Sequence, residues 1–381
     1  MRIIISVAGR FHAFNLAEEL QKRGHLKSLI TSYPKSEVQK YGIPKEKIFS
    51  NILVEAIGRG YRKLPGFLRS FGNPQYLNCE VFDKWASKKV SGADICVAWS
   101  SYALHTLRAA KKAGAVTIIE RGSSHISFQH SILKEEYEKF GLKSQLGHPK
   151  VVQKEIEEYN EADFISIPSL YVKRTFLEKG FPESKLIHVP YGADLSSFRQ
   201  VKKEDNVFRI IFAGGMSLRK GVHYLLRAFA ELNLPNSELM LIGSINDEIK
   251  PFFKKYDGKF NYIGHVPQKE LYKYYSQGSV FCLMSIEEGL AMVQPQAMAC
   301  GLPVICTTNT GGEDIVRDGL DGFVIPIRDV NLLKEKLLYL YKNSERRLQM
   351  GRSAKERVSS GFTWNDYGSK IVDAYKKVLN D

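Results

Sequence analysis

Residues 285–305 read Ser-Ile-Glu-Glu-Gly-Leu-Ala-Met-Val-Gln-Pro-Gln-Ala-Met-Ala-Cys-Gly-Leu-Pro-Val-Ile and predict a loop that enters a short helix. Gly301 stands where the C-cap of that helix is expected, and Pro303 then stops the helix. Because the first N–H groups of a helix have no partner within it, such a loop suits a phosphate. One carboxylate, Glu288, precedes the helix, and the amide of Gln296 lies on its first turn.

Length and composition indicate an ordinary globular protein of two domains. The chain has 381 residues, of which 44% are apolar and 25% charged, and one domain usually takes about 100–200 residues. No apolar run approaches the roughly 18 residues that a membrane-spanning helix needs. The apolar run at the N-terminus is too short for a signal peptide and indicates a first strand. The five cysteines show no CxxC spacing, which favours reduced thiols in the cytoplasm over disulfides or a metal site.

Positive charge is concentrated in the first part of the chain. Residues 1–150 carry +12 of the total net charge of +14. This imbalance indicates an anionic surface or substrate, such as phospholipid headgroups, a lipid-pyrophosphate acceptor or nucleic acid. Lysines that serve only solubility explain it equally well. No recognised nucleic-acid-binding module occurs, so we expect no nucleic-acid partner.

Strand and helix patterns alternate in both halves, which signals parallel α/β sheets. In the first half we expect strands at 3–7, 28–31, 95–98, 116–119, 164–167 and 187–189, and a helix at 13–23. In the second half we expect strands at 208–213, 239–242, 262–263, 280–283, 304–306 and 322–325, and helices at 222–232, 330–342 and 364–379. A polar, charged run at 200–206 separates the two halves.

A second glycine-rich segment, residues 212–222, connects a predicted strand to a predicted helix. Gly214 and Gly215 allow the backbone to come close to a ligand. Arg219 and Lys220 lie at the helix entrance, where positive charge adds to the free N–H groups. This arrangement stabilises a pyrophosphate, both when bound and as it departs. The alternative is two unrelated cations at a solvated helix start.

Together the two segments resemble the donor site of family-4 glycosyltransferases (glycosyl transferases group 1), whose signature is Glu-x7-Glu. The likeness is strong over about residues 205–381 and weak over 35–110. It implies an α/β fold of the GT-B class, in which two Rossmann-like domains face a central cleft. We expect an acceptor-binding domain at 1–200, a nucleotide-sugar-binding domain at 201–363, and a C-terminal helix at 364–381 that packs back on the first domain.

The resemblance also implies roles for the charged residues. An arginine and a lysine of the family contact the donor diphosphate, and Arg219 and Lys220 match them here. The family arginine often follows the first glycine directly, where this chain has Gly215. The first acid of the signature contacts hydroxyls of the donor sugar. Glu288 matches it in spacing, and the adjacent Glu287 offers an alternative register.

Further donor contacts implied by the resemblance come from the backbone. One loop of the family holds the nucleotide base. A second segment, which has the sequence Gly-Phe-Gly in most members, points its backbone N–H groups toward the phosphates. The residues expected in these two roles are Gly264, His265, Val266, Gly289, Leu290, Ala291, Met292 and Val293.

Gln296 departs from the family pattern, which has a glutamate there. A carboxylate accepts from both ribose hydroxyls, whereas an amide has one acceptor oxygen and a donor NH2. We therefore expect either a donor that carries deoxyribose, as in a dTDP-sugar, or a ribose contact that has moved elsewhere.

Polar residues in the first half follow two predicted strands. His125 is the best match to a family histidine that approaches the donor sugar, although Glu120 lies nearer to the strand end. His12 follows the first strand, in the usual acceptor loop. A lone histidine is as often structural as functional, so both alternatives stay open.

Mixed basic and apolar residues occupy 51–73, including Arg59, Arg62, Leu64 and Phe67. Such a mixture suits an interfacial segment on an anionic membrane. A core-packed helix with a solvated basic face fits the pattern equally well.

These features predict a retaining, metal-independent hexosyl- or deoxyhexosyltransferase. It would move a sugar from a UDP-, GDP- or dTDP-linked donor to a glycan or lipid-linked acceptor in surface polysaccharide biosynthesis. We expect it in the cytoplasm, peripheral on the inner face of the plasma membrane, without a cofactor or metal. The alternative, prompted by Gln296, is a catalytically silent nucleotide-sugar-binding subunit of a glycosyltransferase complex.

Overall fold

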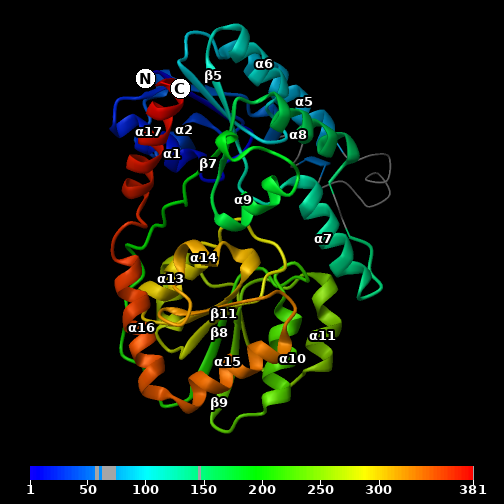
Figure 1. The fold of residues 1–381 in the computed structure, drawn as a ribbon, viewed down its shortest axis with the longest axis vertical. Coiled ribbons are helices and arrows are strands. Elements are labelled where there is room, and N and C mark those ends of the chain that lie inside the picture. The colour runs from blue at the N-terminus through cyan, green and yellow to red at the C-terminus, as the bar shows by residue number, and fades with distance from the viewer. Residues whose placement is uncertain (56–59, 62–73, 145–146, 381) are drawn as a thin grey trace.

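A computed structural model describes residues 1–55, 60–61, 74–144 and 147–380 of this protein. Figure 1 shows two α/β bodies, one above the other, each built around its own parallel sheet. The central strands are buried along their whole length, as is usual where helices cover both faces of a parallel sheet.

The first body contains a seven-stranded sheet in the order β3-β2-β1-β4-β5-β6-β7. Its order reverses between β1 and β4, and ligands of such sheets bind beyond the carboxyl ends of strands at that point. The strands are β1 (Ile3–Val7), β2 (Leu26–Thr31), β3 (Ile48–Ser50), β4 (Ile95–Trp99), β5 (Val116–Glu120), β6 (Phe164–Ile167) and β7 (Leu186–His188).

Helices of the first body bury one face each, as Leu16 and Leu20 of the first helix illustrate. They are α1 (Ala13–Lys22), α2 (Lys35–Gln39), α5 (Gln75–Ala86), α6 (Leu104–Lys112), α7 (Ile126–Glu138), α8 (Pro149–Glu161) and α9 (Leu170–Leu177).

The second body contains a six-stranded sheet in the order β10-β9-β8-β11-β12-β13. Its strands are β8 (Phe208–Ala213), β9 (Ser237–Ile242), β10 (Asn261–Gly264), β11 (Val280–Leu283), β12 (Val304–Thr307) and β13 (Gly322–Ile325). Its helices are α10 (Val222–Leu232), α11 (Lys250–Lys255), α12 (Leu271–Tyr275), α13 (Val293–Ala299), α14 (Gly312–Ile315), α15 (Val330–Lys342) and α16 (Ser344–Val358).

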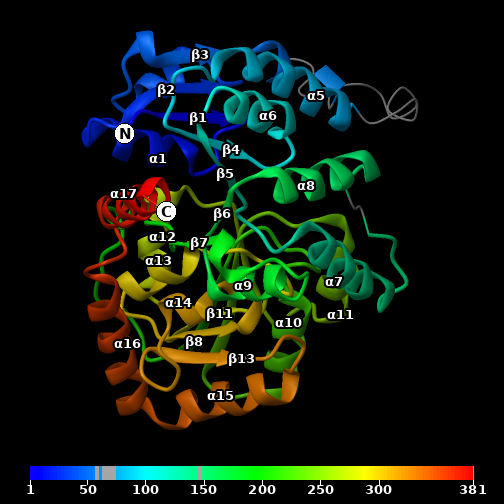
Figure 2. The same cartoon turned by 45° about the horizontal axis from the view of Figure 1, so that its top comes forward.

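The last helix, α17 (Trp364–Asn380), returns to the first body and lies against α1 in Figures 1 and 2. Tyr367 and Tyr375 are buried in this contact. Arg23 of the first body donates from Nη2 to the Asn365 carbonyl oxygen at 2.8 Å. The predicted return of the C-terminal helix is therefore confirmed.

The chain crosses between the bodies twice, and the two crossings touch. Ala193 on the first crossing forms a parallel bridge with Thr363 on the second, and its N–H donates to the Phe362 carbonyl oxygen at 2.7 Å. A Cβ on Gly192 would lie only 2.5 Å from the Thr363 carbonyl oxygen. The two crossings are therefore joined through their backbones.

Every element predicted with bounds is present. Of these, β1, β6, β8, β11, β13, α10 and α15 agree to the residue, and the others differ by one or two residues at an end. Helix α16 was not predicted, because its buried face is made partly of small residues, Gly351 and Ala354, and shows little apolar period. A Cβ on Gly351 would lie 2.2 Å from the Gly301 carbonyl oxygen, so α16 approaches the segment after α13 closely. Strand β3 was also missed, since three residues carry no measurable alternation.

Gly221 provides a test of the loop that precedes α10. Its φ is 64°, and a Cβ there would lie 1.8 Å from the Met284 carbonyl oxygen. We expect Gly221→Ala to lower the free energy of unfolding by about 2 kcal/mol or more, through left-handed strain and a backbone clash. Gly258→Ala is the matched control, because Gly258 has a φ of 71° but nothing within 4 Å of its Cβ position. Equal losses in urea unfolding would show that the clash is relieved at no cost.

Candidate functional site

Loops at the carboxyl edge of the second sheet meet through their backbones. The N–H of Gly214, directly after β8, donates to the Ile242 carbonyl oxygen at 2.9 Å. A Cβ on Gly243 would lie 2.0 Å from the Gly214 carbonyl oxygen, so only glycine fits there. Gly215 follows in the same loop. This contact fixes the loop after β8 against the loop after β9.

The same loop positions two cations. The Arg219 carbonyl oxygen accepts from the N–H of Ile286 at 2.8 Å, and the N–H of Lys220 donates to Ser217 Oγ at 3.2 Å. Both backbone positions are therefore fixed, while 35% of the Arg219 side chain and 23% of the Lys220 side chain remain exposed. Both side chains are therefore partly accessible to solvent.

Glu288 lies beside these cations. Its carboxylate accepts a hydrogen bond from the Lys220 ammonium, and its Oε1 lies 4.0 Å from Arg219 Nη2. The Glu288 N–H donates to the Asn309 carbonyl oxygen at 2.9 Å, which anchors the loop to the segment after β12. Neighbouring strands β8 and β11 bring the pair together.

Glu287, considered only as an alternative register, forms the denser network. Its side chain is wholly buried, and Arg219 Nε donates both to its Oε2 at 3.0 Å and to its carbonyl oxygen at 2.9 Å. Burial alone would raise the pKa of this carboxyl, but Arg219, Gln129 and Ser124 together hold the pKa below its usual range. Glu287 is therefore a buried anion. The sequence analysis considered Glu287 only as an alternative to Glu288, since partners so distant in the sequence leave no local signal.

Backbone groups after Glu288 are partly occupied by the fold. Leu290 and Ala291 are buried, and the N–H of Ala291 donates to the Thr310 carbonyl oxygen at 3.1 Å. The expectation that this N–H faces a phosphate does not fit the structure. Gly289 is packed against the first body, and α13 begins at Val293.

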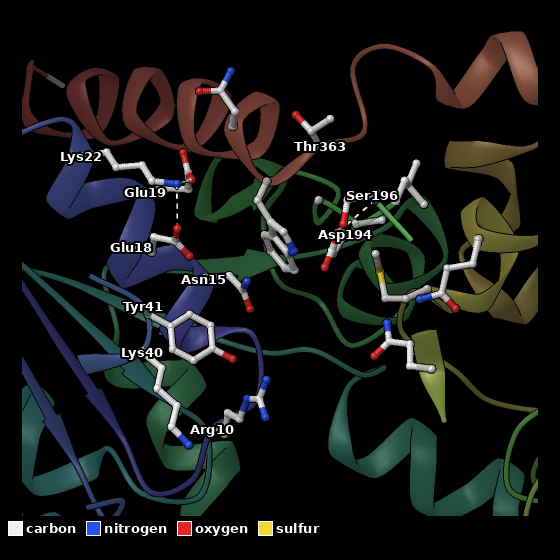
Figure 3. Close-up of a pocket in the computed structure, with 18 residues that line it drawn as sticks. Arg10, Asn15, Glu18, Glu19, Lys22, Lys40, Tyr41, Asp194, Ser196 and Thr363 are labelled. Atoms are coloured by element: carbon white, nitrogen blue, oxygen red, sulfur yellow. Dashed lines mark hydrogen bonds and ion pairs between the residues drawn. The ribbon is translucent and has the colours of Figure 1, made fainter. Parts of the chain in front are cut away.

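Gln296 lies on α13 at the wall of a cavity of about 790 Å³ between the two bodies. Figure 3 shows residues from α1 and its neighbouring loops on one side of the hollow and residues from the two crossings on another. The second body contributes Met292 and Gln268 next to Gln296. Labelled residues of the first body and the crossings are Arg10, Asn15, Glu18, Glu19, Lys22, Lys40, Tyr41, Asp194, Ser196 and Thr363.

Residues 195–357 match the model of the family glycosyl transferases group 1. This segment contains both cations, both acids and Gln296. An uncharacterized glycosyltransferase of Methanocaldococcus jannaschii is 31% identical over 172 residues, which are 45% of this chain and 47% of that protein. A GDP-mannose-dependent phosphatidylinositol monomannoside mannosyltransferase of Mycolicibacterium smegmatis is 24% identical over 56% of this chain and 62% of its own length.

The chain matches about half the length of the first of these curated relatives, whereas the fold is shared over the whole chain. The crystal structure of HepE from Anabaena in complex with UDP has a TM-score of 0.70 to this chain at 14% identity, covering 99% of this chain and 100% of that one. The two-body architecture with a returning C-terminal helix is thus the GT-B fold, as the sequence resemblance implied.

His125 does not join the glycosyltransferase-like site. It is the N-cap of α7, where its Nδ1 accepts from the Ser127 N–H at 3.2 Å. Its ring is 3% exposed and packs against Tyr159, Phe176 and Phe181. We therefore correct the expectation that its imidazole faces a donor sugar, because the fold already uses this side chain as a cap and as part of an aromatic core.

His12 and Glu120 meet each other in the first body. His12 Nε2 lies 3.4 Å from Glu120 Oε2, and the His12 ring lies 3.9 Å from the Tyr191 ring between centroids. Glu120 is wholly buried, and its other oxygen accepts from Ser166 Oγ at 2.7 Å. Glu120 therefore contacts His12 from inside the first body and has no exposed surface that a sugar could contact.

The segment expected to hold the base begins at Gly264, the last residue of β10, and continues into the loop that follows. Gly264 has a φ of 82°, and its carbonyl oxygen accepts from the Gly243 N–H at 2.8 Å. His265 is exposed, and Val266 packs against the core. The backbone of residues 264–266 remains a predicted contact for the base.

His125 provides a pH test of the corrected assignment. Burial first, and the nearby Arg121 and Lys179 next, lower the pKa of this histidine from 6.5 to about 4. Between pH 4 and pH 6.5, His125 therefore binds a proton in the unfolded chain but not in the folded chain. The contribution of neutral His125 to the free energy of unfolding is complete above about pH 6.5 and is lost as the pH falls toward 4. His125→Asn retains an oxygen that can cap α7.

We expect this variant to lose less stability than the wild type between pH 7.5 and pH 5, by on the order of 2 kcal/mol. Urea unfolding at the two pH values measures the difference. Identical losses in both proteins would mean that His125 is protonated at no cost in the folded state.

Proposed function

We propose that this chain is a retaining, metal-independent glycosyltransferase that moves a sugar from a nucleotide-sugar donor to a glycan or lipid-linked acceptor in polysaccharide biosynthesis. The observation that carries the proposal is the pairing of Lys220 with Glu288 beside Arg219. This group lies in the segment that matches glycosyl transferases group 1, at the carboxyl edge of the second sheet.

The proposed donor site exchanges one set of charge contacts for another. Without a ligand, Lys220 and Glu288 neutralise each other. A diphosphate attracts Lys220 and the free Nη groups of Arg219, because charge-assisted bonds to phosphate are strong. Glu288 is then free to accept hydrogen bonds from the sugar hydroxyls. The two cations stabilise the negative charge that grows on the leaving diphosphate while the acceptor hydroxyl attacks from the same face.

The cavity between the bodies is the proposed place of the acceptor. Arg10 and Lys40 line its first-body side, and Arg10 also lies 5.4 Å from the Tyr41 ring centroid. Glu18, Glu19 and Asp194 line the same cavity, so the proposed contact for an anionic or phosphate-bearing acceptor is specifically the side of Arg10 and Lys40. The similar mannosyltransferase of M. smegmatis is named for a phosphatidylinositol acceptor, which supports a lipid-linked one.

Peripheral membrane attachment belongs to the same proposal. No helix among the described residues is long and apolar enough to cross a membrane. Most of the 51–73 segment that was predicted to be interfacial lies outside the described residues. At its described start, Ile52 and Leu53 are 56% and 66% exposed, which supports an apolar contact with anionic lipid.

Lys220→Ala tests the donor site. With a panel of UDP-, GDP- and dTDP-sugars and a lipid-linked acceptor fraction, we expect the wild type to transfer sugar and this variant to lose about 100-fold in kcat. Lys250→Ala is the matched control, because Lys250 lies in the second body but pairs with Asp247 at the surface. The anomeric configuration of the product, read by NMR, tests retention. Nucleotide binding without transfer by the wild type would favour the silent-subunit alternative.

Gln296→Glu tests the nucleotide. If the amide reflects a deoxyribose donor, the wild type prefers dTDP-sugars, and the added carboxylate shifts the preference toward UDP-sugars by about tenfold in kcat/KM. A wild type that prefers UDP- or GDP-sugars and is accelerated by this substitution would contradict the deoxyribose interpretation.

A further inference from the structure

Glu287 binds both bodies with one carboxylate. Its Oε1 accepts from the Ser124 N–H at 3.1 Å and from Ser124 Oγ at 2.8 Å. Its Oε2 accepts from Gln129 Nε2 at 2.9 Å and from Arg219 Nε at 3.0 Å. In the first body, Ser124 directly precedes the N-cap of α7 and Gln129 lies on its first turn, whereas Arg219 belongs to the second body. The carboxylate is therefore fully satisfied only when the two bodies are together.

The orientation of Arg219 depends on this network. Its Nε is used twice by Glu287, once by the carboxylate and once by the carbonyl oxygen. These two bonds hold the Nε edge of the guanidinium and leave the Nη edge for another partner. Because a guanidinium is planar and rigid, fixing one edge fixes the direction of the other.

Close backbone contact makes the network sensitive to the separation of the bodies. A Cβ on Gly289 would lie 1.7 Å from the Gly122 carbonyl oxygen, and the Gly289 carbonyl oxygen accepts from Ser169 Oγ at 2.6 Å. Glu287 thus lies next to a place where the loops of the two bodies touch. If the bodies separated, water would replace the first-body donors of this carboxylate, and its position would no longer be fixed by Ser124 and Gln129.

The far end of α7 is held by the second body as well. Glu136 is wholly buried and accepts from Tyr224 Oη at 2.8 Å and from Arg328 Nε at 2.7 Å, with His223 Nε2 at 3.0 Å. Figures 1 and 2 show α7 beside α10 and α11 of the second body. Buried carboxylates therefore connect α7 to the second body at both ends.

We propose that Glu287 is a positioning residue that couples closure of the cleft to the orientation of Arg219. When Ser124 and Gln129 reach Glu287, its carboxylate turns the Nη edge of Arg219 toward an incoming diphosphate. When the bodies separate, the carboxylate loses these donors and Arg219 loses its fixed direction. The coupling rests on the proposed function in one respect, namely that Arg219 contacts a diphosphate.

Inorganic pyrophosphate tests the coupling without a sugar donor or an acceptor. Isothermal titration measures its affinity for the wild type, Gln129→Ala, Glu287→Gln and the double variant, each confirmed as folded by circular dichroism. We expect Gln129→Ala to weaken binding about tenfold, although it changes only the first body. Glu287→Gln is expected to weaken it at least as much, and the double variant no further, because both changes interrupt one path. Gln153→Ala on α8, where Gln153 bonds Glu157 at the surface, is the matched control.

Three results would overturn the inference: no binding of pyrophosphate to the wild type, unchanged affinity in folded Gln129→Ala, or additive losses in the double variant. A merely structural role would lower the melting temperature of the variants without this pattern of affinities. The result also separates this inference from the proposed function. If the variants show the expected pyrophosphate affinities but the wild type transfers no sugar, the proposed transferase activity is refuted and the coupling stands. If the wild type transfers sugar but the variants bind pyrophosphate as the wild type does, the coupling is refuted and the transferase activity stands.

Discussion

Parallel strand pairing is the constraint on which the arrangement of the cleft depends. In each sheet every paired strand runs in the same direction, so the loops that follow the strands gather at one edge. The loop after β8 carries both cations, and the loop after the neighbouring β11 carries both acids. Because β8 and β11 are adjacent, the loops that follow them lie side by side, and this places Lys220 next to Glu288.

Charge balance explains why four ionised side chains can gather at this edge. Arg219 and Lys220 are matched by Glu287 and Glu288, so the group is neutral as a whole. The two acids nevertheless differ in environment. Glu287 is wholly buried and held by donors from both bodies, whereas Glu288 keeps some exposure and contacts a flexible lysine. Glu287 is therefore fixed by its buried contacts, whereas the partly exposed Glu288 can exchange Lys220 for another partner.

Local pattern was enough to predict nearly all the strands and the helices α1, α10, α15 and α17, because apolar periodicity and glycine positions are local properties. The bounds of β8 and α10, and hence the place of Arg219 and Lys220, follow from them. The position of His125 could not be predicted in this way, since its aromatic neighbours on α8 and α9 lie tens of residues further along the chain. The partners of Glu287 in the first body were equally hidden, because they lie about 160 residues away in sequence.

The bridge between Ala193 and Thr363 has a mechanical consequence. Two segments that share a backbone hydrogen bond cannot move independently at the point where they meet. The buried tyrosines of α17 lie beyond this point and fasten the end of the second crossing to the first body. The bodies are therefore joined by two connected segments, not by one free linker, and any change in the angle between them must move both crossings together.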